Sequence, residues 1–311
     1  MENRVLGLHH ITAIAGDAKR NLEFYTQVLG LRLIKKTVNF DDPGTYHLYY
    51  GDEVGTPGSI LTIFPWGTIV PGRRGSRMAT EIGYSVPPGS FDFWLNRFET
   101  HNVTYNKPAE KFGELYLTFL DPDGLKLELI IPQNLDNRQP WTTSEVNAGV
   151  ATRGFHNITL TLNDVKPTAA ILTDIFGYTL LNQQVNRYRY ITNAIEHAAI
   201  VDLVEVPGER PGHVAGGTIH HVAFRVPNNE ILMEFREKVV RKGLSITEQI
   251  DRNYFYSLYF REPGGVLFEI ATDNPGFTAD ESLSELGTHL KLPPQYEPRR
   301  ADIEKVLPKL D

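Results

Sequence analysis

Hydrophobic positions along this chain alternate between two spacings, one typical of strands and one typical of helices. Residues 7–14 (GLHHITAI) have the pattern of a strand. In the following segment, residues 17–31, apolar side chains such as Leu22, Tyr25 and Leu29 recur at helical spacing. Three further strand-like runs complete the unit, at residues 32–40, 45–51 and 59–66. The pattern therefore predicts the element order β-α-β-β-β.

The same order of elements recurs three more times. The later units begin near Ala79, at Gly154 and at Thr218, with helices expected within residues 90–102, 165–178 and 228–243. Such a repeat indicates copies of one supersecondary unit. We therefore predict an α+β protein of four β-α-β-β-β modules. The expected divisions are an N-terminal domain of modules one and two (1–145), a C-terminal domain of modules three and four (146–275) and a wrapping tail (276–311).

The composition narrows the sources of chemistry. The 311 residues include no cysteine, which excludes disulfides and thiolate catalysis and favours a reducing, cytoplasmic location. The net charge of −7 indicates no basic patch of the kind that nucleic acid requires. No apolar run approaches the roughly 18 residues of a membrane span. Any catalysis must therefore use histidine, carboxylate, tyrosine or arginine side chains, or a bound metal.

A pair of adjacent histidines stands near the start of the first strand in two modules. Residues 7–12 (GLHHIT) align with 154–159 (GFHNIT), with 218–223 (TIHHVA) and with 79–84 (ATEIGY) of the second module. The fourth position of this alignment is His10, Ile82, Asn157 and His221 in modules one to four. Because side chains alternate between the faces of a strand, residues of one such column can point into a shared site.

The last strands of modules two and four align on a tight turn. Residues 121–128 (DPDGLKLE) match residues 262–269 (EPGGVLFE), so Glu128 and Glu269 are equivalent. At the same position the alignment places Ile63 in module one and Leu203 in module three.

These alignments predict one metal site, which modules one and four build together. They supply His10, His221 and Glu269, whereas modules two and three offer only Asn157 and Glu128 as polar groups. The pairing of modules two and three is therefore expected to be an empty relic. Two histidines and one carboxylate form the facial triad of non-haem Fe(II) oxygenases, which leaves open positions on the metal.

The four modules, with these two histidine pairs and the last glutamate, resemble the vicinal oxygen chelate superfamily of glyoxalases, bleomycin resistance proteins and extradiol dioxygenases. The resemblance covers nearly the whole chain and implies two glyoxalase-like domains with cupped mixed sheets. Lyase-type relatives usually add a fourth ligand where this chain has Ile63, and catechol-cleaving relatives take a histidine where it has Asn157. The ligand positions are most similar to those of hydroquinone-cleaving extradiol dioxygenases.

The resemblance to that group extends to residues around the metal. Its motif matches this chain at His9, His10, Thr12, His220, His221, Arg252, Tyr259 and Glu269. It implies that His10, His221 and Glu269 bind metal and that the other five residues are catalytic, with a histidine as the acid or base. The implied cofactor is Fe(II); Mn(II) suits the same ligands, and Zn(II) is the expected substitute in a crystal. The implied partners are a small aromatic substrate and O2, with no nucleic acid or membrane, and the chain is compatible with a homo-oligomer.

Two other functions stay open at this point. One is a metal-dependent glyoxalase-type lyase, isomerase or thiol transferase, against which the missing fourth ligand argues. The other is a non-catalytic small-molecule-binding protein of the same fold, against which the complete triad argues. Outside the motif, we expect His156 to be structural and Glu128 to be a solvent-facing or relic residue, while His47 shows no partner by spacing. Phe64, Trp66 and Phe224 are candidates for a pocket wall, although aromatic residues on strands are usually core.

Overall fold

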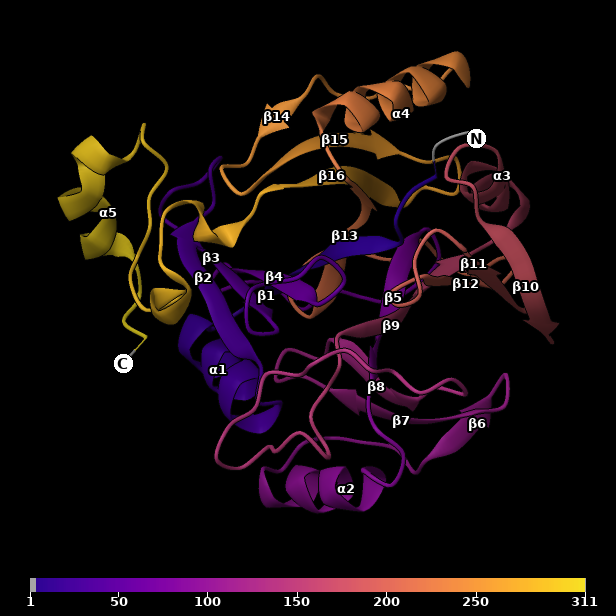
Figure 1. Ribbon diagram of the computed structural model, residues 1–311, viewed down its shortest axis with the longest axis horizontal. Helices are drawn as coiled ribbons and strands as arrows, with labels where there is room; N and C mark the ends of the chain where they lie inside the picture. The colour runs from indigo at the N-terminus through magenta and orange to yellow at the C-terminus, as the bar shows by residue number, and fades with distance from the viewer. Residues whose placement is uncertain (1–3, 311) are drawn as a thin grey trace.

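The computed structural model describes residues 4–310 and contains two curled, eight-stranded mixed sheets (Figure 1). The order in the first sheet is β14 (Ile250–Asp251), β15 (Phe255–Arg261), β16 (Leu267–Pro275), β13 (Thr218–Val226), β1 (Leu8–Ala15), β4 (Ile60–Pro65), β3 (Tyr46–Gly51) and β2 (Arg32–Val38). The order in the second is β10 (Thr179–Gln184), β11 (Arg187–Ile191), β12 (Ile200–Glu205), β9 (Phe155–Leu162), β5 (Met78–Ser85), β8 (Lys126–Ile131), β7 (Glu114–Leu120) and β6 (Ala109–Lys111). The predicted α+β class with two cupped mixed sheets is confirmed.

Each sheet joins one module from the N-terminal half of the chain with one from the C-terminal half. Modules one and four share the first sheet through the antiparallel pairing of β1 with β13, and modules two and three share the second through β5 and β9. The predicted pairing of modules one and four is therefore confirmed. We call each curled sheet a cup. Each cup takes strands from both halves of the chain, so the division after residue 145 stays a prediction about units of the sequence.

The four expected helices cover the outer faces of the sheets. They are α1 (Ala18–Glu23), which continues as the π-helical turn η1 (Phe24–Val28), α2 (Phe91–Thr100), α3 (Lys166–Asp174) and α4 (Asn229–Arg241). The side chain of Asp17 accepts a hydrogen bond from the backbone of Arg20, and Asn228 caps α4 in the same way. Such caps satisfy N–H groups that have no partner within the helix. In Figure 1, α4 lies over β15 and β16.

The segment from residue 276 onward lies against the module-one edge of the first sheet. It contains short 3₁₀ turns at Phe277–Ala279, Leu283–Glu285 and Glu297–Arg299, followed by α5 (Arg300–Val306). Lys35 of β2 is fully buried, and its ammonium group contacts the carboxylates of Asp280, at 2.6 Å, and Glu281. Tyr254 also donates a hydrogen bond to Asp280. These buried ionic contacts fasten the segment to both halves of the first sheet.

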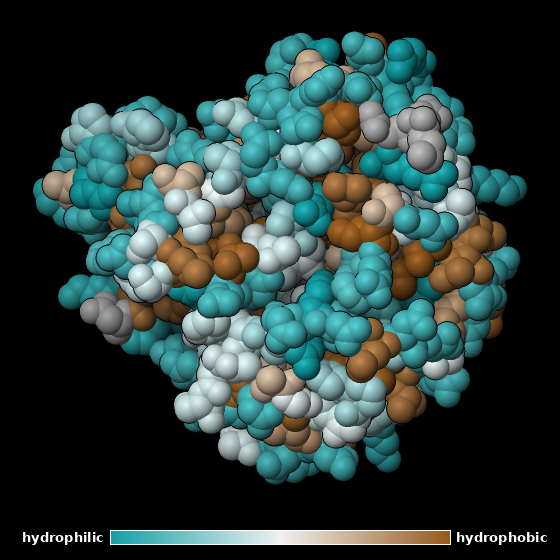
Figure 2. Space-filling view, in the orientation of Figure 1, coloured by the Kyte–Doolittle hydropathy of each residue, from teal (hydrophilic) through white to brown (hydrophobic). Residues whose placement is uncertain are grey.

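The outer surface is mixed in polarity. Figure 2 shows polar residues over most of the face in view, with apolar ones gathered toward the side where β10 to β12 lie. All six residues of β10 are exposed, including Leu180 and Leu181. Within residues 4–310, no helix has the length and apolar character needed to traverse a lipid bilayer.

Candidate metal centre

Three strands of the first sheet bring the predicted ligands together. β1 and β13 run antiparallel side by side, which places His10 and His221 in one cup, and β16 runs parallel to β13 and carries Glu269. The Oε2 atom of Glu269 lies 2.8 Å from Nε2 of His221 and 3.1 Å from Nε2 of His10. The three ligand atoms lie within 4.8 Å of one another, and all three side chains are buried. This is a group that could hold a metal ion.

Hydrogen bonds set the tautomers of His9 and His10. Nε2 of His9 lies 3.0 Å from the carbonyl oxygen of Thr272, which can only accept, so Nδ1 of neutral His9 must be an acceptor. That atom lies 2.9 Å from Nδ1 of His10, which therefore carries the proton and leaves Nε2 free to coordinate. The pair His220 and His221 repeats the arrangement with an Nδ1–Nδ1 distance of 2.8 Å.

The electrostatics of the cup suit a cation. Burial alone would raise the pKa of Glu269, but the neighbouring His10 and His221 hold the pKa of this carboxyl well below its usual range. Its Oε1 atom is buried and, among the residues that the structure describes, has no hydrogen-bond partner. A buried carboxylate with an unpaired oxygen and two imidazole lone pairs beside it fits a divalent transition metal.

The triad opens into a cavity of about 340 Å³. Its lining residues are His10, Thr12, Asn39, Phe40, Asp41, His47, Tyr49, Phe64, Trp66, His220, His221, Arg252, Phe255 and Tyr259. Of the five residues predicted to be catalytic, Thr12, His220, Arg252 and Tyr259 thus line the cavity. His9 does not: it contacts His10 but lines a different cavity, beside Tyr254.

Tyr259 and Arg252 form one corner of the cavity. The guanidinium of Arg252 lies 5.3 Å from the centre of the Tyr259 ring, and that ring packs edge-on against His221 with centroids 5.6 Å apart. Burial, and after it the charge of Glu269, raise the pKa of the Tyr259 phenol, so this hydroxyl stays protonated. The corner therefore offers a neutral hydroxyl donor next to a fixed positive charge.

The sequence did not identify His47 as a residue of the site, because its spacing showed no partner, whereas the structure gives it two. His47 lies on β3, where Nε2 contacts Thr62 and Nδ1 contacts Tyr49, each at 2.9 Å. Its ring packs on Phe64 and Tyr49, with 4.2 Å between centroids in both cases. The alternation of His47 and Tyr49 along β3 was the available signal, since both side chains then share one face.

The register of the strands corrects three positions of the sequence alignment. In each module the first and last strands are paired, and the partner across that pairing defines the equivalent position. Glu269 lies beside Ala223 and Glu128 beside Gly83. In the same way Thr62 lies beside Thr12, and Asp202 lies beside Thr159. The equivalents of Glu269 in modules one and three are therefore Thr62 and Asp202, not Ile63 and Leu203.

The first-strand column changes in module two for the same reason. In the first sheet His221 lies opposite Thr12 of the first strand. Thr159 is the equivalent of Thr12 in module three, and it lies opposite Glu81. Glu81, rather than Ile82, is therefore the equivalent of His221. Bulges in these strand pairs shift the count by one residue, which a sequence alignment cannot detect.

The second cup is not an empty relic, because protein cations fill it. Glu128 is 2% exposed, and its carboxylate contacts the ammonium group of Lys111, so the expectation that it faces solvent is wrong. Arg189 binds Asp202 at 2.9 Å and Glu114 at 2.5 Å. Other ion pairs complete the network: Glu81 with Lys126 and Arg187, and Glu114 with His156 at 3.0 Å. His156, expected to be structural, has this ionic partner.

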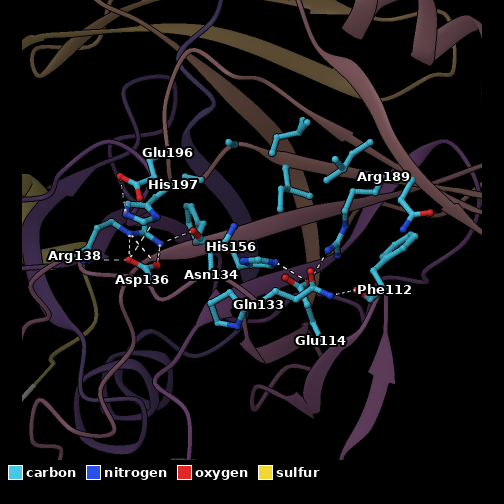
Figure 3. Close-up of a pocket in the computed structure, with 18 residues that line it drawn as sticks. Phe112, Glu114, Gln133, Asn134, Asp136, Arg138, His156, Arg189, Glu196 and His197 are labelled. Atoms are coloured by element: carbon cyan, nitrogen blue, oxygen red, sulfur yellow. Dashed lines mark hydrogen bonds and ion pairs between the residues drawn. The ribbon is translucent and has the colours of Figure 1, made fainter.

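Figure 3 shows the mouth of this second cup, where His156 and Arg189 converge on Glu114. Arg138 and Asp136 pair at 2.7 Å on the opposite wall. Because acids and bases are matched here, the second cup resembles a metal site in which side-chain cations replace the metal.

The ion pairs of the second cup predict a loss of stability in acid. Burial raises the pKa of Glu81, but Arg187 and Lys126 outweigh it and lower that pKa to about 2; His156 and Arg189 do the same for Glu114. An unfolded glutamate titrates near pH 4.3, so this stabilisation is complete above that pH and is lost as the pH falls toward the folded pKa.

Urea unfolding of the metal-free protein between about pH 6 and about pH 3 measures this effect. We expect the free energy of unfolding to fall more steeply in the wild type than in Glu81→Gln, which cannot titrate at this position. Parallel pH profiles of the two proteins would contradict the assignment.

Comparison with known proteins agrees with this architecture. Residues 7–129 and 154–270 match the family model "Glyoxalase/Bleomycin resistance protein/Dioxygenase superfamily". The chain is 44% identical to "Putative ring-cleaving dioxygenase MhqO" of Bacillus subtilis, over 99% of this chain and 97% of that protein. It is 37% identical to a chlorohydroquinone/hydroquinone 1,2-dioxygenase of Sphingobium indicum, over 96% and 94%. A crystal structure described as a "putative dioxygenase" of Bacillus subtilis shares 42% identity and superposes with a TM-score of 0.95, over 100% and 99%.

Proposed function

Since the chain belongs to the glyoxalase/bleomycin resistance protein/dioxygenase superfamily, we propose that it is a non-haem Fe(II) ring-cleaving dioxygenase that acts on hydroquinone-like aromatic compounds with O2. The observation that carries the proposal is the buried triad of His10, His221 and Glu269 at the end of an aromatic-lined cavity. The near full-length similarity to a hydroquinone dioxygenase supports this substrate class. A cytoplasmic location and a homo-oligomeric state stay predictions from the sequence.

His10, His221 and Glu269 would hold the metal, because both Nε2 atoms and the carboxylate point to one place. When bound there, ferrous iron would supply the redox chemistry that lets O2 react with an electron-rich ring. Mn(II) has compatible ligand preferences, so the same residues would accept it.

The remaining polar residues of the cavity have distinct proposed roles. Nδ1 of His220 contacts Nδ1 of His221, and His220 lines the cavity. Burial and His221 lower the pKa of His220 to about 3, so the ring is neutral and would offer its Nε2–H as a hydrogen-bond donor to a substrate oxygen. Arg252 would stabilise negative charge on the ring oxygens, and Tyr259 would donate a hydrogen bond to the substrate. His9 would act indirectly, by holding the His10 tautomer.

The shape of the cavity suits a single aromatic ring. The rings of His47, Phe64 and Trp66 lie in succession along one wall, with centroids 4.2 Å and 5.4 Å apart. Such a wall favours stacking with a planar ring and excludes water from the reacting face. We propose extradiol-type cleavage, in which the ring opens between the carbon that carries the metal-bound hydroxyl and its neighbour.

The register of the first sheet argues against the lyase alternative. Thr62 occupies the position equivalent to Glu269, so module one supplies no carboxylate at that position. Three protein ligands leave more of the metal open, as binding of both an organic substrate and O2 requires.

Addition of hydroquinone to the Fe(II)-reconstituted protein tests the proposal. We expect stoichiometric O2 uptake and a ring-opened product whose mass exceeds that of the substrate by both oxygen atoms. The control is the same protein loaded with Zn(II), which has no redox chemistry. Absence of O2 uptake with hydroquinone, methylhydroquinone and catechol by the iron-loaded protein would disprove the dioxygenase, and a product opened between other ring positions would disprove the extradiol assignment.

A further inference from the structure

The hairpin between the second and third strands of a module is longer in module one than in the other three. In modules two and three its turn consists of residues 112–113 and 185–186. In module four the N–H of Arg252 donates to the carbonyl of Phe255, which leaves residues 253–254 as the turn. In module one the N–H of Asn39 donates to the carbonyl of Thr45, so residues 40–44 make the connection. We call residues 40–44 the rim loop.

The rim loop lies over the metal centre, and residues 39–41 line its cavity. Three side-chain contacts hold the loop there: Tyr296 OH to the Phe40 carbonyl at 2.6 Å, Trp66 Nε1–H to the Asp42 carboxylate at 3.3 Å, and the Asp41 carboxylate to the Arg252 guanidinium at 3.8 Å. The longer connection of module one thus adds residues to the cavity that no other module supplies to its cup.

Tyr49 and Tyr259 occupy equivalent positions on the two sides of the first cup. Tyr49 pairs with Thr62 across strands as Tyr259 pairs with Glu269, and the register makes Thr62 and Glu269 equivalent. The halves of the cup are therefore related by a pseudo-two-fold axis between β1 and β13. Both tyrosines line the cavity, one from each side of this axis.

The same counting makes Asn39 the counterpart of Arg252. Each N–H donates to the carbonyl of the residue four positions before the tyrosine of its own module. In module two, counting back from Thr118 opposite Glu128 gives Lys111, whose ammonium group reaches that carboxylate inside the second cup. This position therefore directs its side chain into a cup in modules one, two and four.

Asn39 differs from its counterparts in being short and neutral. Its side chain is 8% exposed, and Oδ1 accepts a hydrogen bond from the backbone N–H of Asp41 at 2.9 Å, which fixes the orientation of the amide. Within residues 4–310 the Nδ2 group has no hydrogen-bond partner, so its N–H groups are left for the cavity. Because asparagine does not reach as far as arginine or lysine, the space between Asn39 and the triad is left to a ligand.

The other side-chain donors on the wall formed by β2, β3, β4 and the rim loop already have partners. Both ring nitrogens of His47 are in contact with hydroxyl groups, and one of these is the hydroxyl of Tyr49. The indole N–H of Trp66 is used by Asp42. Among the described residues, Asn39 therefore supplies the donor of this wall that is left for a ligand.

We infer that Asn39 forms the subsite for the second hydroxyl group of a para-diol, the one that does not bind the metal. The inference rests on the proposed function and specifies how the ring is selected. With one hydroxyl at the triad beside Tyr259 and Arg252, the ring extends toward module one, where Nδ2 of Asn39 donates to the distal oxygen. A site built to bond a hydroxyl rejects an analogue without it, because the donor is then left unpaired. The rim loop positions Asn39.

Binding to the Zn(II)-loaded protein, which has no redox chemistry, tests the inference apart from catalysis. Hydroquinone and 4-methylphenol differ only in the group at the para position. After correction for the two equivalent hydroxyls of hydroquinone, we expect the wild type to bind it about tenfold more tightly, the upper range for a neutral hydrogen bond. Asn39→Leu should lose this preference. Equal affinity of the wild type for both ligands, or an unchanged preference in Asn39→Leu, would overturn the inference.

Thr45→Val is the matched control for damage to the rim loop. The hydroxyl of Thr45 donates to Asp42 at 2.7 Å, but Thr45 does not line the cavity. Its loss should weaken both ligands alike and leave the preference for hydroquinone unchanged. If Thr45→Val abolished the preference as fully as Asn39→Leu, the selectivity would belong to the position of the loop and not to the donor.

A second pair of ligands tests the direction of the hydrogen bond in a variant that keeps the loop. Asn39→Asp retains an oxygen for the N–H of Asp41 but has no N–H of its own. The para oxygen of 4-methoxyphenol can only accept, and 4-ethylphenol has a methylene group in its place. The wild type should prefer 4-methoxyphenol, and Asn39→Asp should prefer 4-ethylphenol. The same order in both proteins would show that Asn39 is not the donor.

Steady-state kinetics of the iron-loaded protein connect the subsite with turnover. Asn39→Leu should raise KM for hydroquinone about tenfold and change kcat less, since Asn39 holds the ring away from the metal-bound hydroxyl. A fall in kcat at unchanged KM would place Asn39 in the chemical step and overturn this role. A preference that Asn39→Leu abolishes, without any O2 uptake by the wild type, would retain the subsite and refute the dioxygenase.

Discussion

Replacement of Glu269 by glutamine removes metal binding, and with it catalysis. Glutamine preserves the shape of the side chain but not the charge that sits 2.8 Å from His221 and 3.1 Å from His10. Loss of residues that merely orient metal ligands costs about 10–100-fold in affinity, so the loss of an anionic ligand should exceed about 100-fold. Metal content after gel filtration, with O2 uptake on the same sample, measures the effect.

The pseudo-symmetry of the fold supplies a matched control for this experiment. Glu128 occupies the equivalent position in the second cup, where Lys111 replaces a metal. The folded fraction of Glu128→Gln should therefore retain the wild-type metal content. Full metal occupancy in Glu269→Gln would exclude this residue as a ligand.

Substitution of Lys111 by methionine destabilises the protein by about 3–5 kcal/mol, the usual cost of leaving one member of a buried ion pair without its partner. The carboxylate of Glu128 is 2% exposed and sits among the other acids of the second cup, so it cannot be rehydrated without disrupting the sheet. Burial already raises the pKa of Glu128 despite the neighbouring Lys111, and the substitution would raise it further. Urea unfolding of the metal-free protein at neutral pH measures the loss.

Two companion variants separate the buried charge from general damage. The double variant Lys111→Met/Glu128→Leu removes both charges and should recover most of the lost stability, as apolar replacements of buried ion pairs do. Lys126→Met breaks the partly exposed contact with Glu81 and should cost about 1 kcal/mol or less. If Lys111→Met unfolds within about 1 kcal/mol of the wild type, the ion pair is not what stabilises the second cup.

The triad could be read from the sequence because its signals are local. Side chains alternate along a strand, so the repeated histidine pairs could be placed in one column without knowledge of the fold. The turn at residues 262–265 set the position of Glu269 in the same way. The absence of any comparable set in modules two and three then indicated which modules share the site.

The positions that were assigned one residue away lie where strands are irregular. Bulges near Glu81, and long connections before β4 and β12, change the face on which a residue lies, and one residue of slip inverts every side chain. This is why Ile82, Ile63 and Leu203 were placed where Glu81, Thr62 and Asp202 stand. The contacts of His47 were hidden for a related reason, since Thr62 belongs to the neighbouring strand and Thr12 to a third.

By itself, then, the sequence determined the repeated module, the α+β class and the two histidines and one glutamate that converge. These features depend on short-range periodicity, which the order of residues encodes directly. Only the tertiary structure decided that the glutamate of one cup lies between two histidines beside a cavity, while the carboxylates of the other cup are paired with lysine and arginine side chains. That difference depends on which strands pair and in which register, because the charge balance of a buried site is a sum over side chains from distant parts of the chain.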